Sequence, residues 1–159
     1  MISNEHFRAA LSRFASGVTV VTTRSVAGER FGMTVSAFCS LSVEPPLILV
    51  CINKLAPSHN VFVERGAFVV NILGHGQRNV SEQLALPSGD KFVGLETADT
   101  EKGLPVVVGS LVSLECVLHS TYEGGDHSIM VGLVEDAVVH DEAPLVYFKG
   151  DYHRLADED

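Results

Sequence analysis

The 159-residue sequence has no long apolar run and little positive charge. Its longest uninterrupted apolar run covers 47–52, far shorter than the roughly 20 residues of a membrane-spanning helix. Eleven Lys and Arg residues stand against 20 Asp and Glu residues, for a formal net charge of −9. Nucleic acids and anionic membrane surfaces require a basic face, so neither is expected as a partner. The first residues, MISNEHFRAA, lack the basic start and apolar stretch of a signal peptide.

Cysteines and several common motifs are also scarce. Cys39, Cys51 and Cys116 are widely separated within strand-like runs, which favours buried thiols in a reducing cytoplasm over a disulfide framework or a zinc site. The sequence contains no P-loop, HExxH, paired CxxC or GxSxG, so neither a metal site nor a hydrolase is expected. Asp126, His127 and Ser128 do not predict a catalytic triad, because neighbours in an extended chain point to opposite faces.

The sequence does contain many short β-rich runs. Phe7, Ala10, Leu11 and Phe14 share one face of a predicted N-terminal helix, which Ser3 would cap and Gly17 would end. Strands are predicted at 18–23, 31–38, 47–53, 67–73, 106–122, 128–139 and 145–149, short helices at about 58–65 and 77–84, and a loop at 87–104. Many strands without βαβ alternation predict a mainly β, antiparallel barrel with a few short helices, and a single domain over 1–159.

Three stretches contain residues that could serve a binding site. Small residues in the strand at 31–38 would let a flat ligand approach the backbone, although an ordinary strand with one solvated face is the alternative. Ser58 would cap a helix whose N-terminus could bind phosphate with help from Lys54, although a plain capped helix is the alternative. GGDHSIM at 124–130 is either a hairpin that positions His127 for chemistry or a turn with a polar histidine.

Taken together, the sequence resembles the short-chain flavin reductase family over about residues 7–155. The blocks GVTVVT (17–22), EPPL (44–47) and GDH (125–127) contribute most to this similarity. The resemblance implies a Greek-key FMN-binding split barrel that uses NADH or NADPH to reduce FMN or FAD. It also implies a homodimer whose partner is a flavin-dependent monooxygenase component.

The resemblance assigns roles to particular residues. His127 would lie beside the nicotinamide, with Asp126 next to it in the GDH block. The phosphate segment, often NxxSxTH in this family, here has alanine at position 56 and serine at position 58, so one phosphate hydroxyl is missing. The flavin would contact Met33, Thr34, Val35, Ser36, Ala37, Cys51, Ile52, Asn53, Lys54, Ser58, His59 and Phe92.

The expected chemistry requires positioning more than acid or base strength. Hydride transfer from nicotinamide to flavin needs two stacked rings in a dry site, and backbone N–H groups would stabilise the resulting negative charge. The sequence therefore predicts an NAD(P)H:flavin oxidoreductase. The alternative is a flavoprotein that holds FMN as an electron carrier or sensor and does not oxidise NAD(P)H.

Overall fold

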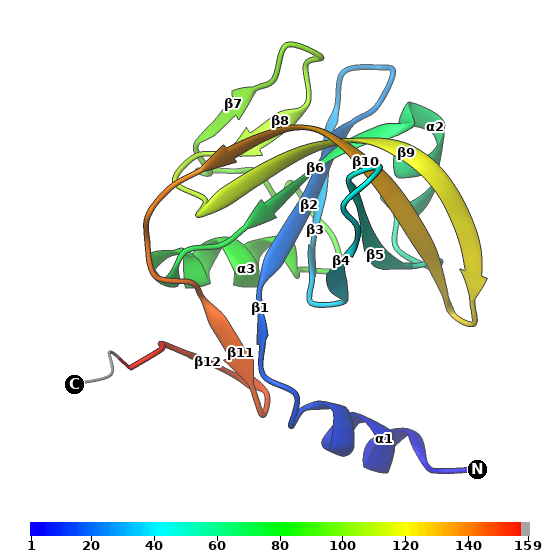
Figure 1. The fold of residues 1–159 in the computed structure, drawn as a ribbon, viewed down its shortest axis with the longest axis vertical. Helices are drawn as coiled ribbons and strands as arrows, with labels where there is room; N and C mark the ends of the chain where they lie inside the picture. Colours follow the sequence, from blue (N-terminus) through cyan, green and yellow to red (C-terminus); the bar gives the residue numbers. More distant parts are fainter. Residues whose placement is uncertain (157–159) are drawn as a thin grey trace.

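The computed structural model describes residues 1–156, most of which lie in or between antiparallel strands (Figure 1). In chain order the elements are α1 (Asn4–Leu11), β1 (Ser16–Gly17), β2 (Thr19–Arg24), β3 (Arg30–Val35), β4 (Phe38–Ser42), β5 (Leu47–Asn53), α2 (His59–Arg65), β6 (Ala67–Ile72), the 3₁₀ turn η1 (His75–Gln77), α3 (Arg78–Leu84), β7 (Thr97–Asp99), β8 (Pro105–Val107), β9 (Val112–Gly124), β10 (His127–Val139), β11 (Val146–Phe148) and β12 (Asp151–His153). Within the described range no helix is long and apolar enough to cross a membrane.

Seven strands form one antiparallel sheet in the order β3-β2-β6-β9-β10-β5-β4. Strand β6 pairs with β2 of the β2–β3 hairpin and with β9 of the β9–β10 hairpin, and β10 then pairs with β5 of the β4–β5 hairpin. The two edge strands, β3 and β4, follow one another in the chain with only Ser36 and Ala37 between them. The sheet therefore curls into a barrel that stays open along β3, which confirms the predicted split-barrel class.

Apolar side chains pack on both faces of this sheet. Within β2, Val21 points into the barrel and Val20 points to the opposite face, so both are fully buried. The barrel interior is filled by Val21, Val35, Ile48, Val50, Ile52, Phe62, Phe68, Val70, Cys116 and Met130. The outer cluster joins β2 to α3 and to Phe92 and Leu145. Two packed faces explain why the predicted strand at 18–23 is almost continuously apolar or β-branched.

Several predicted boundaries are wrong in detail. The strand expected at 31–38 is interrupted at Ser36 and Ala37, where the chain passes from one edge strand to the other. The strand expected at 106–122 is two strands, β8 and β9, separated by a turn in which Gly109 has a φ of +79°. The expected loop at 87–104 contains β7, and the segment after residue 149 contains β12.

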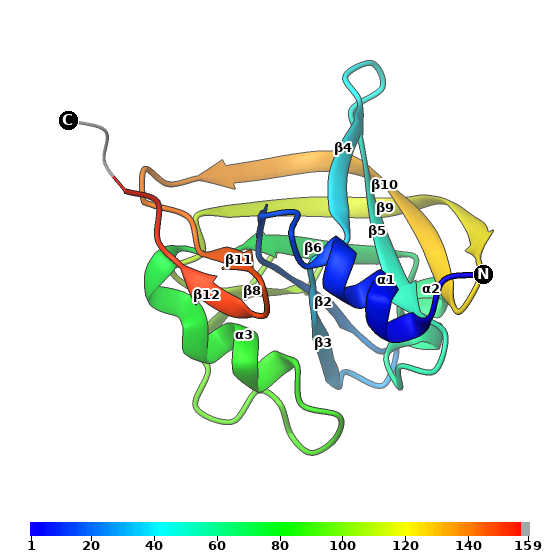
Figure 2. The same ribbon diagram turned by 90° about the horizontal axis from the view of Figure 1, so that it is seen from below.

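The N-terminal helix differs from the prediction in where it ends and what it packs against. Ser3 caps α1, since its hydroxyl accepts a hydrogen bond from the His6 N–H at 3.2 Å, but the helix ends at Leu11 rather than at Gly17. No residue of α1 is buried, and Phe7, Leu11 and the following Phe14 are 53%, 55% and 79% exposed. Both views show α1 outside the barrel (Figures 1 and 2). Its apolar face is therefore uncovered in the single chain.

Candidate functional site

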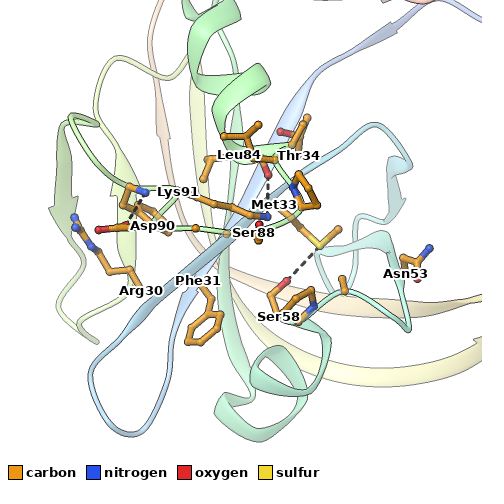
Figure 3. Close-up of a pocket in the computed structure, with 18 of the residues that line it drawn as sticks. Arg30, Phe31, Met33, Thr34, Asn53, Ser58, Leu84, Ser88, Asp90 and Lys91 are labelled. Carbon is orange, nitrogen blue, oxygen red and sulfur yellow. Dashed lines mark hydrogen bonds between the residues drawn. The ribbon is translucent and has the colours of Figure 1, made fainter.

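A cavity of about 670 Å³ opens beside the edge strand β3, between the segment 53–58 and the segment 84–92, which is the end of α3 and the loop that continues from it (Figure 3). Its volume lies within the range typical of small-molecule sites, about 300–1,000 Å³. The lining residues are Arg30, Phe31, Gly32, Met33, Thr34, Asn53, Leu55, Ala56, Pro57, Ser58, Leu84, Ala85, Leu86, Pro87, Ser88, Gly89, Asp90, Lys91 and Phe92. Of the residues predicted to bind a cofactor, Met33, Thr34, Asn53, Ser58 and Phe92 meet here.

The β3 backbone forms one wall of the cavity. This strand pairs with β2 along one edge only, so its other edge offers unpaired N–H and C=O groups. Such groups suit the hydrogen-bonding edge of a planar heterocycle. Gly32 was expected to leave room for a flat ligand. The Phe92 ring fills that space instead, because a Cβ at Gly32 would lie 3.0 Å from it.

Ser58 and Met33 contact each other in the lining of the cavity (Figure 3). Ser58 occupies the N-cap position of α2 as predicted, but its hydroxyl makes no capping bond. The hydroxyl instead donates to the Met33 sulfur at 3.6 Å. Ser58 is only 4% exposed, so this weak bond is made in a buried place where a stronger acceptor would be expected. A thioether is a weak acceptor. The hydroxyl therefore keeps most of its donor strength for a ligand.

Two cations at the cavity were missed by sequence reasoning. Arg30 lies over the Phe92 ring with its guanidinium carbon 4.9 Å from the ring centre, and it donates to Thr97 Oγ1 at 3.1 Å. Lys91 donates to the Leu84 carbonyl at 3.3 Å, and partial burial lowers the pKa of its ammonium group. In the sequence each is a single basic residue directly before a phenylalanine, which does not by itself indicate a shared site. Together these cations favour an anionic ligand.

Other predicted flavin contacts are less direct than expected. The side chains of Val35 and Ile52 belong to the barrel core, so only their backbones could meet a ligand. The Thr34 hydroxyl donates to the Ser81 carbonyl at 2.6 Å and is therefore engaged by α3.

Three further predicted residues lie close to the break in the edge strand. Ser36 and Ala37 are exposed at the break itself. Cys51 is half-buried, and burial raises the pKa of its thiol. Its N–H donates to the Ala37 carbonyl at 3.0 Å, which ties the break to β5.

The β9–β10 hairpin brings Asp126 and His127 to the end of β5. Gly125 and Asp126 form its turn, and Gly125 has a φ of +75°, which glycine adopts readily. His127 pairs in register with Asn53, a cavity residue. Its Nδ1 donates to Asp126 Oδ1 at 2.8 Å, and this bond lowers the pKa of the Asp126 carboxyl group. Neither side chain lines the cavity itself, so the hairpin presents His127 beside it.

Lys54 and His59 were predicted to contact the flavin phosphate, yet both side chains are directed to the hairpin. The Lys54 ammonium group bonds the Glu123 carboxylate and the Gly125 carbonyl, the latter at 2.8 Å. His59 Nε2 lies 2.9 Å from the hydroxyl of Ser128, which is 4% exposed. Asp126 and His127 do contact each other, contrary to the argument from an extended chain, because Asp126 lies in the turn. Ser128, however, faces His59 and is buried, so no triad forms.

The residues present fit a bound flavin. The free edge of β3 suits a heterocycle, Ser58 supplies an underused hydroxyl, and Arg30 and Lys91 suit phosphate. Within residues 1–156 no group of three or more His, Cys, Asp or Glu side chains is placed to hold a metal ion. The cavity can therefore position an anionic, planar molecule.

Comparison with known proteins gives the same picture. The sequence model of a family described as flavin reductase like domain matches residues 11–156. The reductase component of 4-hydroxyphenylacetate 3-monooxygenase from Thermus thermophilus is 47% identical over 152 residues, covering 95% of this chain and 96% of that protein. An NADH-dependent flavin reductase from Rhodococcus is 38% identical, covering 94% and 85% of the two chains. The crystal structure of an NADH:FAD oxidoreductase from Streptomyces globisporus, in complex with NAD and FAD fragments, superposes with a TM-score of 0.92 at 33% identity, covering 98% and 96%.

Proposed function

Because the chain belongs to the flavin reductase like domain family, we propose that it is an NAD(P)H:flavin oxidoreductase that supplies reduced flavin to a partner monooxygenase. The observation that carries this proposal is the near full-length similarity to a monooxygenase reductase component, together with a cavity of matching chemistry. NADH is proposed as the reductant, since two relatives whose names state a nucleotide are both named as NADH-dependent flavin reductases. FMN and FAD both fit the proposal, because the phosphate-binding features serve either one.

The protein's own contribution would be positioning. The free edge of β3 would bind the flavin ring, and Ser58 would donate its hydroxyl to the phosphate while Arg30 and Lys91 offset its charge. A bound flavin supplies the hydride acceptor. The Asp126 carboxylate accepts the Nδ1 proton of His127, so Nε2 of that ring is left to meet the nicotinamide. Apolar neighbours such as Phe31 and Leu86 would exclude water from the stacked rings.

Steady-state kinetics test the proposal. Purified protein should accelerate NADH oxidation when FMN, FAD or riboflavin is added, and anaerobic reactions should accumulate free reduced flavin. Absence of acceleration with every combination of NADH or NADPH and these flavins would overturn the proposal. A tightly retained yellow colour with no NADH oxidation would support an electron carrier instead.

We further propose that the protein is a homodimer in which a second copy covers α1. The exposed apolar face of this helix needs a partner surface, since a helix of eight residues is marginal in water without packing. The β4–β5 hairpin also projects from the barrel, with Leu41 and Val43 50% and 92% exposed (Figure 2). The three unpaired thiols are the reason to place this dimer in the cytoplasm.

Light scattering after size exclusion tests the dimer. The wild-type mass should be twice that of the chain, and the double substitution Phe7→Ser, Leu11→Ser should shift it toward the monomer. Val26→Ser, at an exposed apolar residue in the β2–β3 turn, is the matched control and should leave the mass unchanged. A monomeric wild type would overturn this part of the proposal and leave the reductase activity untouched.

A further inference from the structure

The hairpin tip that carries His127 is attached to the segment 53–59 by more than the β5–β10 ladder. The ladder ends where His127 pairs with Asn53. One residue further, the Lys54 N–H donates to the Asp126 carbonyl at 3.0 Å. Residues 121–126 of the tip are all exposed, so no core packing holds it. The position of His127 therefore depends on a few polar contacts of the tip.

Lys54 provides most of those contacts. Its ammonium group bonds the Gly125 carbonyl at 2.8 Å and the Glu123 carboxylate, so one side chain contacts both the end of β9 and the turn itself. The same contact lowers the pKa of the Glu123 carboxyl group, because the ammonium stabilises the charged form. On the other side of the tip, His59 from α2 bonds the buried Ser128 hydroxyl at 2.9 Å. The tip is therefore held at two points flanking His127.

We propose that Lys54 is a positioning residue for NADH, which fixes His127 through the hairpin tip and does not bind the flavin phosphate. This inference rests on the proposed reductase function. Its support is that the ammonium group is already paired within the hairpin and that Lys54 does not line the cavity, whereas its neighbours Asn53 and Leu55 do. Two of the three N–H donors of this ammonium group are therefore already used within the hairpin, on the side away from the cavity lining.

The variant Lys54→Met keeps the apolar stem and removes the ammonium group. We expect kcat/KM for NADH to fall about five-fold, as for loss of two weak charge-assisted contacts on a partly exposed surface, while the Kd for FMN stays within about two-fold of wild type. Lys54→Arg should recover most of the lost activity, since Arg can bond both acceptors. Lys102→Met is the matched control: Lys102 bonds Glu115 and Glu135 of the same hairpin, far from the tip, and its loss should not alter NADH kinetics.

A double-mutant cycle tests whether Lys54 acts through His127. In a His127→Ala background, Lys54→Met should cause no further fall in kcat/KM for NADH. Multiplying effects in the double variant would overturn the proposal. So would a raised Kd for FMN with unchanged NADH kinetics, which would make Lys54 a phosphate ligand, or an equal effect of Lys102→Met.

Hydrogen exchange separates this proposal from the reductase function. If wild-type protein oxidises no NADH, the function fails, but the amides of 125–128 should still exchange faster in Lys54→Met than in wild type. Glu123→Gln, which keeps an acceptor oxygen but removes the negative charge that pairs with Lys54, should give an intermediate rate. Unchanged exchange at the tip in both variants would overturn the positioning role, whatever the kinetics show.

Discussion

The variant Ser58→Ala tests whether the cavity binds a phosphate where Ser58 lies. The hydroxyl is 4% exposed and its partner among the described residues is the Met33 sulfur, at 3.6 Å. Because a thioether accepts weakly, the free energy of unfolding should change by less than about 1 kcal/mol on loss of this bond. A bond from the same hydroxyl to a charged phosphate is worth about 1.5–3 kcal/mol. That loss corresponds to a rise in the Kd for FMN of about 10- to 150-fold.

Quenching of flavin fluorescence measures the affinity directly. FMN and riboflavin differ only by the phosphate, so Ser58→Ala should weaken FMN binding and leave riboflavin binding nearly unchanged. Ser88→Ala is the control, because Ser88 is an exposed residue of the segment 84–92 on another wall of the same cavity. Equal losses for FMN and riboflavin would place the hydroxyl at the flavin ring or its sugar chain. An unchanged Kd for FMN would refute any contact.

Three further variants and one control test the hairpin, the barrel and a buried thiol. His127→Ala should lower kcat/KM for NADH more than it weakens FMN binding, and equal losses in both assays would make the residue structural. Gly132→Ala should destabilise the fold by about 1–3 kcal/mol in urea unfolding, because the new Cβ would lie 2.8 Å from the Phe68 ring. Gly17→Ala, with open space around it, should change stability by less than about 0.5 kcal/mol, and an equal loss there would refute the packing argument. Burial raises the pKa of the Cys116 thiol to about 12 from its ordinary 9.0, so the contribution of this thiol to stability should be constant below pH 9 and fall as pH rises toward 12. Cys116→Ala should reduce this loss of stability at alkaline pH. Urea unfolding midpoints of both proteins, measured below and above pH 9, would show the difference.

The strands were predictable where burial alternates or the apolar run is continuous. The structure gives β5 the predicted range 47–53, because its residues alternate between half-buried and buried along the strand. The prediction failed at 106–122 because β-branched residues continue across the turn at Gly109, and strand propensity alone does not mark such a turn. For α1 the helical spacing identified the helix. It did not show that the apolar face of this helix lies exposed in the single chain.

The sequence indicated some of the residues that meet at the cavity but not the two cations beside them. Ser58, Asn53 and Met33 come together as expected from their sequence blocks. Arg30 and Lys91 were missed because they reach the cavity from the start of an edge strand and from a loop whose path the sequence does not specify. The roles of Lys54 and His59 could not be separated from that of Ser58 by sequence, since residues adjacent in a turn can face different partners.

Side chains of the segment 53–59 contact both the cavity and the hairpin, so binding at the two places should be thermodynamically coupled. Asn53 and Ser58 line the cavity, whereas Lys54 and His59 bond the hairpin that carries His127. A ligand that orders this segment from the cavity side must also favour the anchored hairpin, because the same backbone serves both. Linkage requires the reverse effect to be equally large, so a nucleotide held by the hairpin would tighten flavin binding. Flavin affinity measured with and without a non-reacting nicotinamide nucleotide should therefore differ in the wild type, and the difference should vanish when Lys54 is replaced by Met.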